Sequence, residues 1–194
     1  MSDFSTAYLQ DLKLLLDSID VADIDRVIGI ILDAARNDKQ IFILGNGGSA
    51  ATASHFACDL GKGTVSQFFD SSAPRLRVIA LNDSIPVMTA YGNDLAYEHI
   101  FSQQLGNLVN AGDVVIGISV SGNSKNVINA IRLANERNAT TIGMLGADGG
   151  ALKALVDHDI HFKDRHFGRV EDAHMVCAHI IAYAIKEIMR GGNQ

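Results

Sequence analysis

The sequence predicts an α/β fold in which helices cover both faces of a doubly wound parallel sheet, and three observations support this. Short apolar runs alternate with segments of helical periodicity through the middle of the chain. The runs at residues 41–44 and 114–118 are apolar on both faces, as buried parallel strands are. Turns rich in glycine or serine follow both runs directly, which is typical of the step from a strand to a helix.

Two helices are expected before the first strand. Apolar residues recur at steps of three and four over residues 4–19, and a second helical pattern extends to residue 37, with Asp20 or Asp23 available as its cap. The first helix is followed by a second helix and precedes every strand, so it cannot be a crossover that joins two strands of the sheet. We therefore expect the N-terminal helices, residues 4–37, to pack on the outside of the fold or on another subunit.

The rest of the chain alternates between strands and helices. Strands are expected over residues 41–44, 76–81, 114–118, 140–145 and 159–162. Helices are expected over residues 50–60, 84–90, about 97–105, 125–137, a short stretch ending near 156, and 170–190. A loop is expected over residues 61–75 and a turn at Gly92–Asp94. Right-handed crossovers would join the five strands into one sheet, so residues 1–194 should form a single domain.

Composition excludes several classes of partner. The net charge is −6 and the 16 Lys and Arg residues are scattered, so nucleic acid is not an expected ligand. Cys58 and Cys177 lack metal-binding or redox spacing, so we expect free, buried thiols in a reducing compartment. No apolar run approaches the length of a membrane span and the first residues lack a signal pattern, so a cytoplasmic protein without membrane contact is expected.

The loop at residues 119–125, Ser-Val-Ser-Gly-Asn-Ser-Lys, is the strongest sign of ligand binding. Ser119, Ser121 and Ser124 add hydroxyl donors to the free N–H groups and positive dipole end of the helix that follows. One serine would be enough for a helix cap, so three favour a phosphate site over capping alone. The G-x-x-x-x-G-K-[ST] spacing of nucleotide-hydrolysing loops is absent, so a smaller phosphate ester is favoured.

A second loop, Gly45-Asn-Gly-Gly-Ser49, follows the first strand. Its glycines allow the backbone to approach a ligand closely, while its asparagine and serine offer donors. The loop also matches the dinucleotide pattern G-x-G-x-x-[GA], but the acidic candidate Asp83 lies far beyond the usual interval of about 20 residues. We therefore expect no nucleotide cofactor. Ligands of doubly wound sheets bind beyond the carboxyl ends of the strands, so both loops should line one crevice.

Ionisable residues recur on two of the expected helices. His55 and Asp59 are four residues apart, so they share a face and suit a metal ion or a proton-transfer pair. Glu171 and His179 are eight apart, about 80° around the helix axis, and His174 lies between them. Two histidines and two carboxylates suit zinc or another divalent ion. Such spacings also occur on solvated helix faces, so they permit a metal site without requiring one.

Together these residues resemble the sugar isomerase (SIS) domain family, and within it the phosphoheptose isomerases. The resemblance rests on both loops, Gly92–Asp94, Gly149–Gly150, Arg169 and the ionisable residues of the two helices. It implies a flavodoxin-like, three-layer sandwich and a homotetramer with active sites at subunit interfaces. It also implies one zinc or other divalent metal per subunit, and the conversion of sedoheptulose 7-phosphate to D-glycero-D-manno-heptose 7-phosphate.

This resemblance and the helix positions suggest roles for individual residues. The hypothesis for an enediol mechanism takes Asp59 and His179 as the catalytic acid–base pair. The implied metal ligands are His55, Asp59, Glu171 and His179. The implied substrate-binding residues are Asn46, Gly47, Gly48, Ser49, Asn93, Asp94, Ser119, Val120, Ser121, Ser124 and Glu171. For Asn93 and Asp94, a turn with an Asx cap is an equally good interpretation.

Three positions depart from the family pattern. Asp59 stands where glutamate is typical, Glu171 where glutamine is typical, and Gly63 where an arginine would help to hold substrate. A non-catalytic SIS module is the alternative to an enzyme. It would act as a sugar-phosphate sensor or as a protein-binding regulator of the replication-initiation type. Another phosphosugar isomerase is a third possibility. Retention of both histidines and both carboxylates favours the enzyme.

Overall fold

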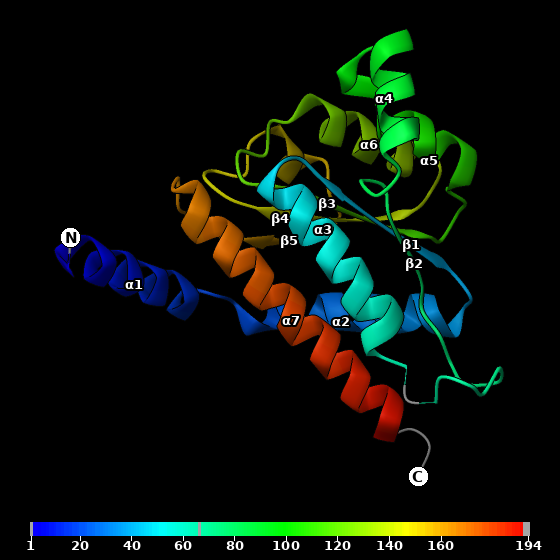
Figure 1. Ribbon diagram of the computed structural model, residues 1–194, viewed down its shortest axis with the longest axis horizontal. Coiled ribbons are helices and arrows are strands. Elements are labelled where there is room, and N and C mark those ends of the chain that lie inside the picture. Colours follow the sequence, from blue (N-terminus) through cyan, green and yellow to red (C-terminus); the bar gives the residue numbers. More distant parts are fainter. Residues whose placement is uncertain (1, 66, 192–194) are drawn as a thin grey trace.

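The computed structural model describes residues 2–65 and 67–191, and its centre is a five-stranded sheet (Figure 1). All neighbouring strands pair in parallel, in the order β2-β1-β3-β4-β5. This confirms the expected doubly wound sheet. The strands are β1 Gln40–Gly45, β2 Arg77–Ala80, β3 Val114–Ser119, β4 Thr140–Leu145 and β5 His158–His161.

Helices cover both faces of the sheet. One face carries α2, α3 and α7, and the other carries α5 and α6 (Figure 1). The α-helices are α1 Ser2–Asp17, α2 Val21–Arg36, α3 Gly48–Cys58, α4 Ile85–Asp94, α5 Ser102–Leu108, α6 Lys125–Glu136 and α7 Phe167–Gly191. A π-helix, η1 Asp59–Gly63, continues α3, and two short 3₁₀ helices are η2 Tyr97–His99 and η3 Ala151–Ala154.

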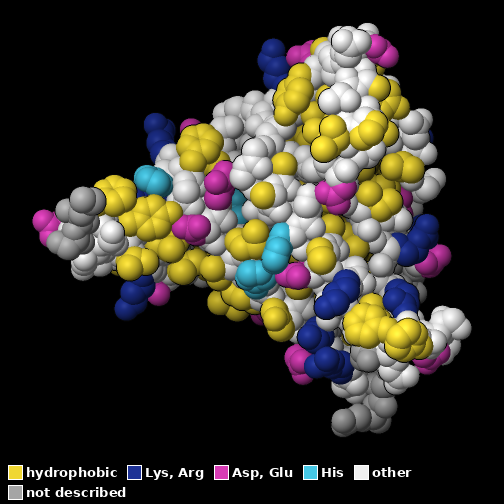
Figure 2. Space-filling view, viewed as in Figure 1, with side chains coloured by type: hydrophobic (Ala, Val, Ile, Leu, Met, Phe, Trp, Pro, Cys, Tyr) yellow, Lys and Arg dark blue, Asp and Glu magenta, His cyan; other side chains and the backbone are white. Residues whose placement is uncertain are grey.

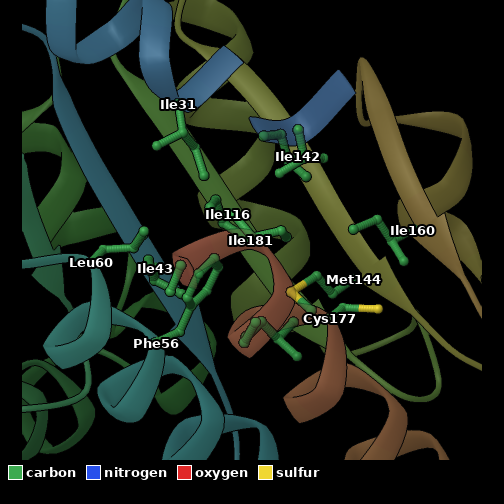
Figure 3. Close-up of a cluster of buried hydrophobic side chains, with 14 of the residues drawn as sticks. Ile31, Ile43, Phe56, Leu60, Ile116, Ile142, Met144, Ile160, Cys177 and Ile181 are labelled. Carbon is green, nitrogen blue, oxygen red and sulfur yellow. The ribbon is translucent and has the colours of Figure 1, made fainter. Parts of the chain in front are cut away.

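Two hydrophobic cores result, one on each face. In β1, Ile41 and Ile43 point into the core beneath α2, α3 and α7, whereas Phe42 and Leu44 point into the other. All four side chains are at most 1% exposed, which explains why this strand reads as a continuous apolar run. Figure 3 shows the first core, where Phe56 of α3 and Ile181 of α7 pack against strand residues.

The strand order creates a switch point between β1 and β3. From β1 the chain passes to β2 on one side and later returns to β3 on the other side of β1. The loops that leave β1 and β3 therefore diverge, and a crevice forms beyond the carboxyl ends of these two strands. This crevice lies between the loop at residues 45–49, called the glycine loop, and the loop at residues 119–125, called the serine loop.

The helix α1 lies outside the sandwich and projects from it beside the start of α7 (Figure 1). Its Tyr8 hydroxyl donates to Asp172 of α7 at 2.6 Å. Hydrophobic side chains along α1 remain open to solvent, including Phe4, Leu9 and Leu14, which are 64–72% exposed (Figure 2). No described helix has both the length and the apolarity needed to cross a membrane.

Two local expectations were wrong. Gly92–Asp94 does not form a turn, because α4 continues to Asp94 and ends at Leu95. A single helical glycine costs only about 1 kcal/mol, which the rest of the helix can offset. The segment after α3 is also not loop from residue 61, since the π-helix η1 extends the helical backbone to Gly63.

Candidate functional site

A pocket of about 240 Å³ lies at the switch point, between the two loops and the start of α7. Nine of the eleven expected substrate-binding residues line it. Ile118 and the exposed ring of Phe167, which sequence reasoning did not single out, complete the wall. The nine are Asn46, Gly47, Gly48, Ser49, Ser119, Val120, Ser121, Ser124 and Glu171.

The serine loop presents its hydroxyl groups within this pocket. Ser119 Oγ accepts the N–H of Gly122 at 3.1 Å and lies 3.2 Å from Ser124 Oγ. Ser124 is the N-cap residue of α6, yet its side chain makes no capping hydrogen bond. Helix capping therefore does not account for Ser124, and its hydroxyl remains at the pocket wall together with that of Ser119. This arrangement suits an anion bound by neutral donors.

The serine loop is held by main-chain packing against the turn after β4. Gly122 has φ +63°, and a Cβ there would lie 1.9 Å from the carbonyl oxygen of Gly149. The N–H of Leu152 donates to Gly122 O at 3.0 Å, and the N–H of Ala151 donates to Asn123 Oδ1 at 3.0 Å. The close approach explains why both segments contain glycine.

Asparagine side chains brace the glycine loop from both sides. The amide of Asn82, just beyond β2, donates to Gly45 O at 2.7 Å and accepts the N–H of Gly45 at 3.2 Å. Asn126 in α6 exchanges two hydrogen bonds with Asn46, at 2.8 and 2.9 Å, and Tyr97 donates to the same Asn46 oxygen at 3.0 Å. Sequence reasoning missed Asn82 and Asn126, although both sit close to the carboxyl edge of the sheet.

Glu171 lies over the first residue of α3. A Cβ built on Gly48 would be 2.4 Å from Cδ and both carboxylate oxygens of Glu171. Gly48 therefore leaves the space that this carboxylate fills. Asn93 and Asp94, by contrast, do not line the pocket in this chain. They are exposed at the end of α4, where Asn93 donates to Asp94 at 2.9 Å, and their role in substrate binding stays a prediction.

A second cluster lies farther along α3 and α7. His55 Nε2 and His179 Nε2 are 3.0 Å apart, and Asp59 Oδ2 lies 3.3 Å from the first and 3.7 Å from the second. The side chains are 49%, 45% and 28% exposed in the order His55, His179 and Asp59. Figure 2 shows histidine side chains together at the centre of this face.

This cluster fits a divalent metal ion. The three candidate ligand atoms lie within 4.8 Å of one another, and two imidazoles with one carboxylate are ligands that zinc accepts. Glu171 does not belong to this group among the described residues, since it lines the pocket at the switch point instead. The structure thus brings together three of the four implied ligands. Glu171 as a metal ligand stays a prediction.

His174 is a core residue. It is fully buried, its Nε2 lies 3.2 Å from the carbonyl oxygen of Leu145, and its ring packs edge-on against Phe162. Burial lowers the pKa of His174 to about 4, so the side chain is neutral at physiological pH. The free, buried state expected for both thiols holds for Cys177, whose pKa burial raises to about 12, but Cys58 is exposed.

Comparison with known proteins agrees with the fold and the site. The family model described as SIS domain matches residues 7–146, which is most of the chain and includes both loops. The chain belongs to the SIS domain family.

The SIS relatives of this chain include many phosphoheptose isomerases. The phosphoheptose isomerase of Trichlorobacter lovleyi is 37% identical over 194 residues, covering 98% of this chain and 96% of the relative. That of Geobacter metallireducens is 37% identical over 160 residues, or 82% of each chain. The solved phosphoheptose isomerase from Neisseria gonorrhoeae superposes with a TM-score of 0.85 at 32% identity and 96% coverage of both chains.

More distant solved structures are similar to this chain in fold alone. One is the Vibrio vulnificus NanR protein complexed with ManNAc-6P, with a TM-score of 0.66 at 15% identity. The match covers 94% of this chain and 60% of that one.

Proposed function

We propose that this SIS protein is a phosphoheptose isomerase, an aldose–ketose isomerase that converts sedoheptulose 7-phosphate to D-glycero-D-manno-heptose 7-phosphate. One observation carries the proposal. The serine-lined pocket includes the first turns of α3 and α7, and the His55–Asp59–His179 cluster lies farther along α3, its continuation η1 and α7. Relatives of this chain bear that name. One end of a substrate can therefore be bound by its phosphate group while the other end undergoes proton transfer.

The spacing of the two parts fits a seven-carbon sugar. Glu171 at the phosphate pocket precedes His179 by eight residues of α7, which is about 12 Å of helix rise. Six carbon–carbon bonds of about 1.5 Å span roughly 8 Å in an extended chain, and the phosphate ester lengthens the molecule further. A substrate anchored by its 7-phosphate thus reaches the histidine cluster with C1 and C2.

Asp59 and His179 would carry out the isomerisation through an enediol. Asp59 removes the proton from C1 of the ketose and delivers it to C2, while His179 gives a proton to O2 and accepts the one on O1. The exchange leaves the carbonyl at C1 and returns both residues to their starting protonation states. A divalent ion held by His179 would occupy the ring nitrogen that otherwise carries this proton, and it would then stabilise the negative charge on O1 and O2 in place of the protonated imidazole.

The proposed metal is zinc or another divalent ion, one per subunit, held by His55, Asp59 and His179. Elemental analysis of the purified protein should find close to one equivalent per chain. It should find much less in His55→Ala and His179→Ala variants. Equal metal content in the variants and the parent protein would refute these ligands. No nucleotide cofactor is proposed.

A homotetramer in the cytoplasm, with sites completed at subunit interfaces, is also part of the proposal. It is supported by the open apolar side chains of α1 and by Phe167, which is 61% exposed at the rim of the phosphate pocket. Neighbouring copies would cover both. Neither nucleic acid nor a membrane is a proposed partner.

Incubation with sedoheptulose 7-phosphate tests the function directly, with product detected by NMR. We expect conversion by the parent protein and a loss of at least about 100-fold in kcat in Asp59→Asn and His179→Ala, as is usual when a general acid or base is removed. Near-normal turnover in both variants would refute the roles of these residues. Binding without conversion by the parent protein would favour the non-catalytic sensor, and a panel of other sugar phosphates would identify a different isomerase.

A further inference from the structure

The side chain of Asn46 reaches the pocket at the switch point with an amide whose orientation is set by its neighbours. It lines the pocket beside the serine loop. It also exchanges two hydrogen bonds with Asn126, which is 2% exposed. The oxygen and the nitrogen of an amide have nearly the same shape, so a pair of asparagines can face either way unless a partner of known type decides. Here the main chain provides that partner.

The main-chain N–H of Val127 donates to Asn126 Oδ1 at 3.0 Å, and a main-chain N–H can only donate. Asn126 therefore accepts from Asn46 with this oxygen, at 2.8 Å, and donates from Nδ2 to Asn46 Oδ1, at 2.9 Å. The hydroxyl of Tyr97 donates to the same Asn46 oxygen at 3.0 Å, so both of its lone pairs are used. No described residue accepts the second proton of Asn46 Nδ2, which stays available as a donor.

We propose that Asn126 and Tyr97 are positioning residues, which hold the amide of Asn46 so that its free N–H, and not its oxygen, meets the bound substrate. Neither is among the described residues that line the pocket, so both act through Asn46. A sugar phosphate offers acceptor oxygens to this N–H, and a donor that is already oriented loses less side-chain freedom on binding. The inference rests on the proposed function and extends it to residues outside the pocket.

Tyr97→Phe tests the proposal most directly, because it removes one hydroxyl and keeps the ring. We expect KM for sedoheptulose 7-phosphate to rise about threefold, as one neutral hydrogen bond would give. The value of kcat should stay within about twofold, since Asn46 would bind the ground state and the transition state alike. Asn126→Ala should raise KM about tenfold. Tyr91→Phe is the matched control, because it removes a hydroxyl that accepts from Asn107 at 3.1 Å, outside the described lining of the pocket.

A double-mutant cycle with Asn46→Ala separates positioning from other roles. In the Asn46→Ala background, Tyr97→Phe should cause no further rise in KM, because the amide that it orients is gone. The same rise with and without Asn46 would overturn the proposal. So would a KM in Tyr97→Phe no higher than in Tyr91→Phe, or a fall in kcat at unchanged KM. Thermal unfolding checks that each variant is folded.

Calorimetric titration with sedoheptulose 7-phosphate repeats the comparison without turnover, and so separates this inference from the proposed function. If the parent protein binds the sugar phosphate but does not convert it, the proposed function fails, while weaker binding by Tyr97→Phe still supports the positioning role. If the parent protein converts the substrate and Tyr97→Phe binds it equally well, the positioning role fails and the proposed function stands. Absence of binding by the parent protein would overturn both.

Discussion

At the scale of single residues, the pocket at the switch point offers neutral donors to an anion, and no lysine or arginine is among the described residues that line it. Hydroxyl groups and main-chain N–H groups supply the donors. Among them, the side chain of Ser119 is nearly buried, at 3% exposure. Neutral donors keep their hydrogen-bonding capacity across the physiological pH range. Binding should therefore depend little on the ionisation of the protein's own cations.

Removing both central hydroxyls should weaken substrate binding. For Ser119→Ala with Ser124→Ala we expect KM for the sugar phosphate to rise at least about tenfold, because each lost hydrogen bond to a charged group contributes about 1.5–3 kcal/mol. Steady-state kinetics measures this. Ser72→Ala, which changes an exposed hydroxyl on the loop before β2, is the control. Unchanged KM in the double variant would contradict the role of the serines.

Buried His174 should make stability depend on pH. Its pKa is about 4 in the folded protein and near 6.5 when unfolded, so between these values only the unfolded state takes up the proton. Stability is therefore lost as pH falls from about 6.5 to 4, by up to about 3 kcal/mol from this residue.

Chemical denaturation of His174→Gln across this range provides the measurement. The variant should be less stable at pH 7, because it disturbs the core, but should lose less stability on acidification than the parent protein does. His99→Gln, which alters a histidine whose side chain is 40% exposed, is the comparison. A parallel pH dependence in His174→Gln and the parent would show that His174 is not the cause.

At the scale of elements, the site depends on how loops and helix ends are fixed. The strands and the two loops could be predicted from the sequence, because apolar runs and clusters of glycine or serine are local signals. The structural roles of Asn82 and Asn126 could not be predicted, because they come from hydrogen bonds to the glycine loop that form only in the folded protein. The sequence also could not predict that Glu171 lies over Gly48, since that contact depends on how α7 packs against α3.

The main-chain contact at Gly122 should be intolerant of a side chain. Gly122→Ala places a methyl group 1.9 Å from a carbonyl oxygen at a positive φ, so we expect a loss of about 2–4 kcal/mol and weak phosphate binding. Gly29→Ala in α2 has nothing within 4 Å of its new methyl group and should instead stabilise the protein by roughly 0.5–1 kcal/mol. Thermal and urea unfolding distinguish the two; equal effects would contradict the packing argument.

At the scale of the whole molecule, α1 joins the body through the first turns of α7. Arg169 donates from Nη1 to Asp11 of α1 at 2.9 Å and forms a double hydrogen bond with Asp164, at 2.6 and 3.0 Å. The guanidinium lowers the pKa of Asp164. The same first turns carry Phe167 and Glu171 at the phosphate pocket. The position of α1 is thus linked to the geometry of the site.

The exposed face of α1 should be where copies of the chain meet. Replacing Leu9 and Leu14 by glutamate places charges on that face, so we expect the assembly to dissociate into smaller species, seen by light scattering, with a loss of turnover if sites are shared. Lys13→Glu also adds negative charge to α1 and controls for charge alone. An unchanged mass in the double variant would exclude α1 from the interface.

The contact between Gly122 and Gly149 also limits how the protein can evolve. A Cβ on Gly122 would collide with the carbonyl group of Gly149, and a Cβ on Gly150 would collide with the backbone of Ser121 and Gly122, so this part of the proposed anion site has little room for substitution. New sugar preferences would have to arise at lining residues that have more room, such as the exposed Phe167 at the start of α7. A fixed anion site combined with variable lining residues would allow the same fold to bind many different sugar phosphates.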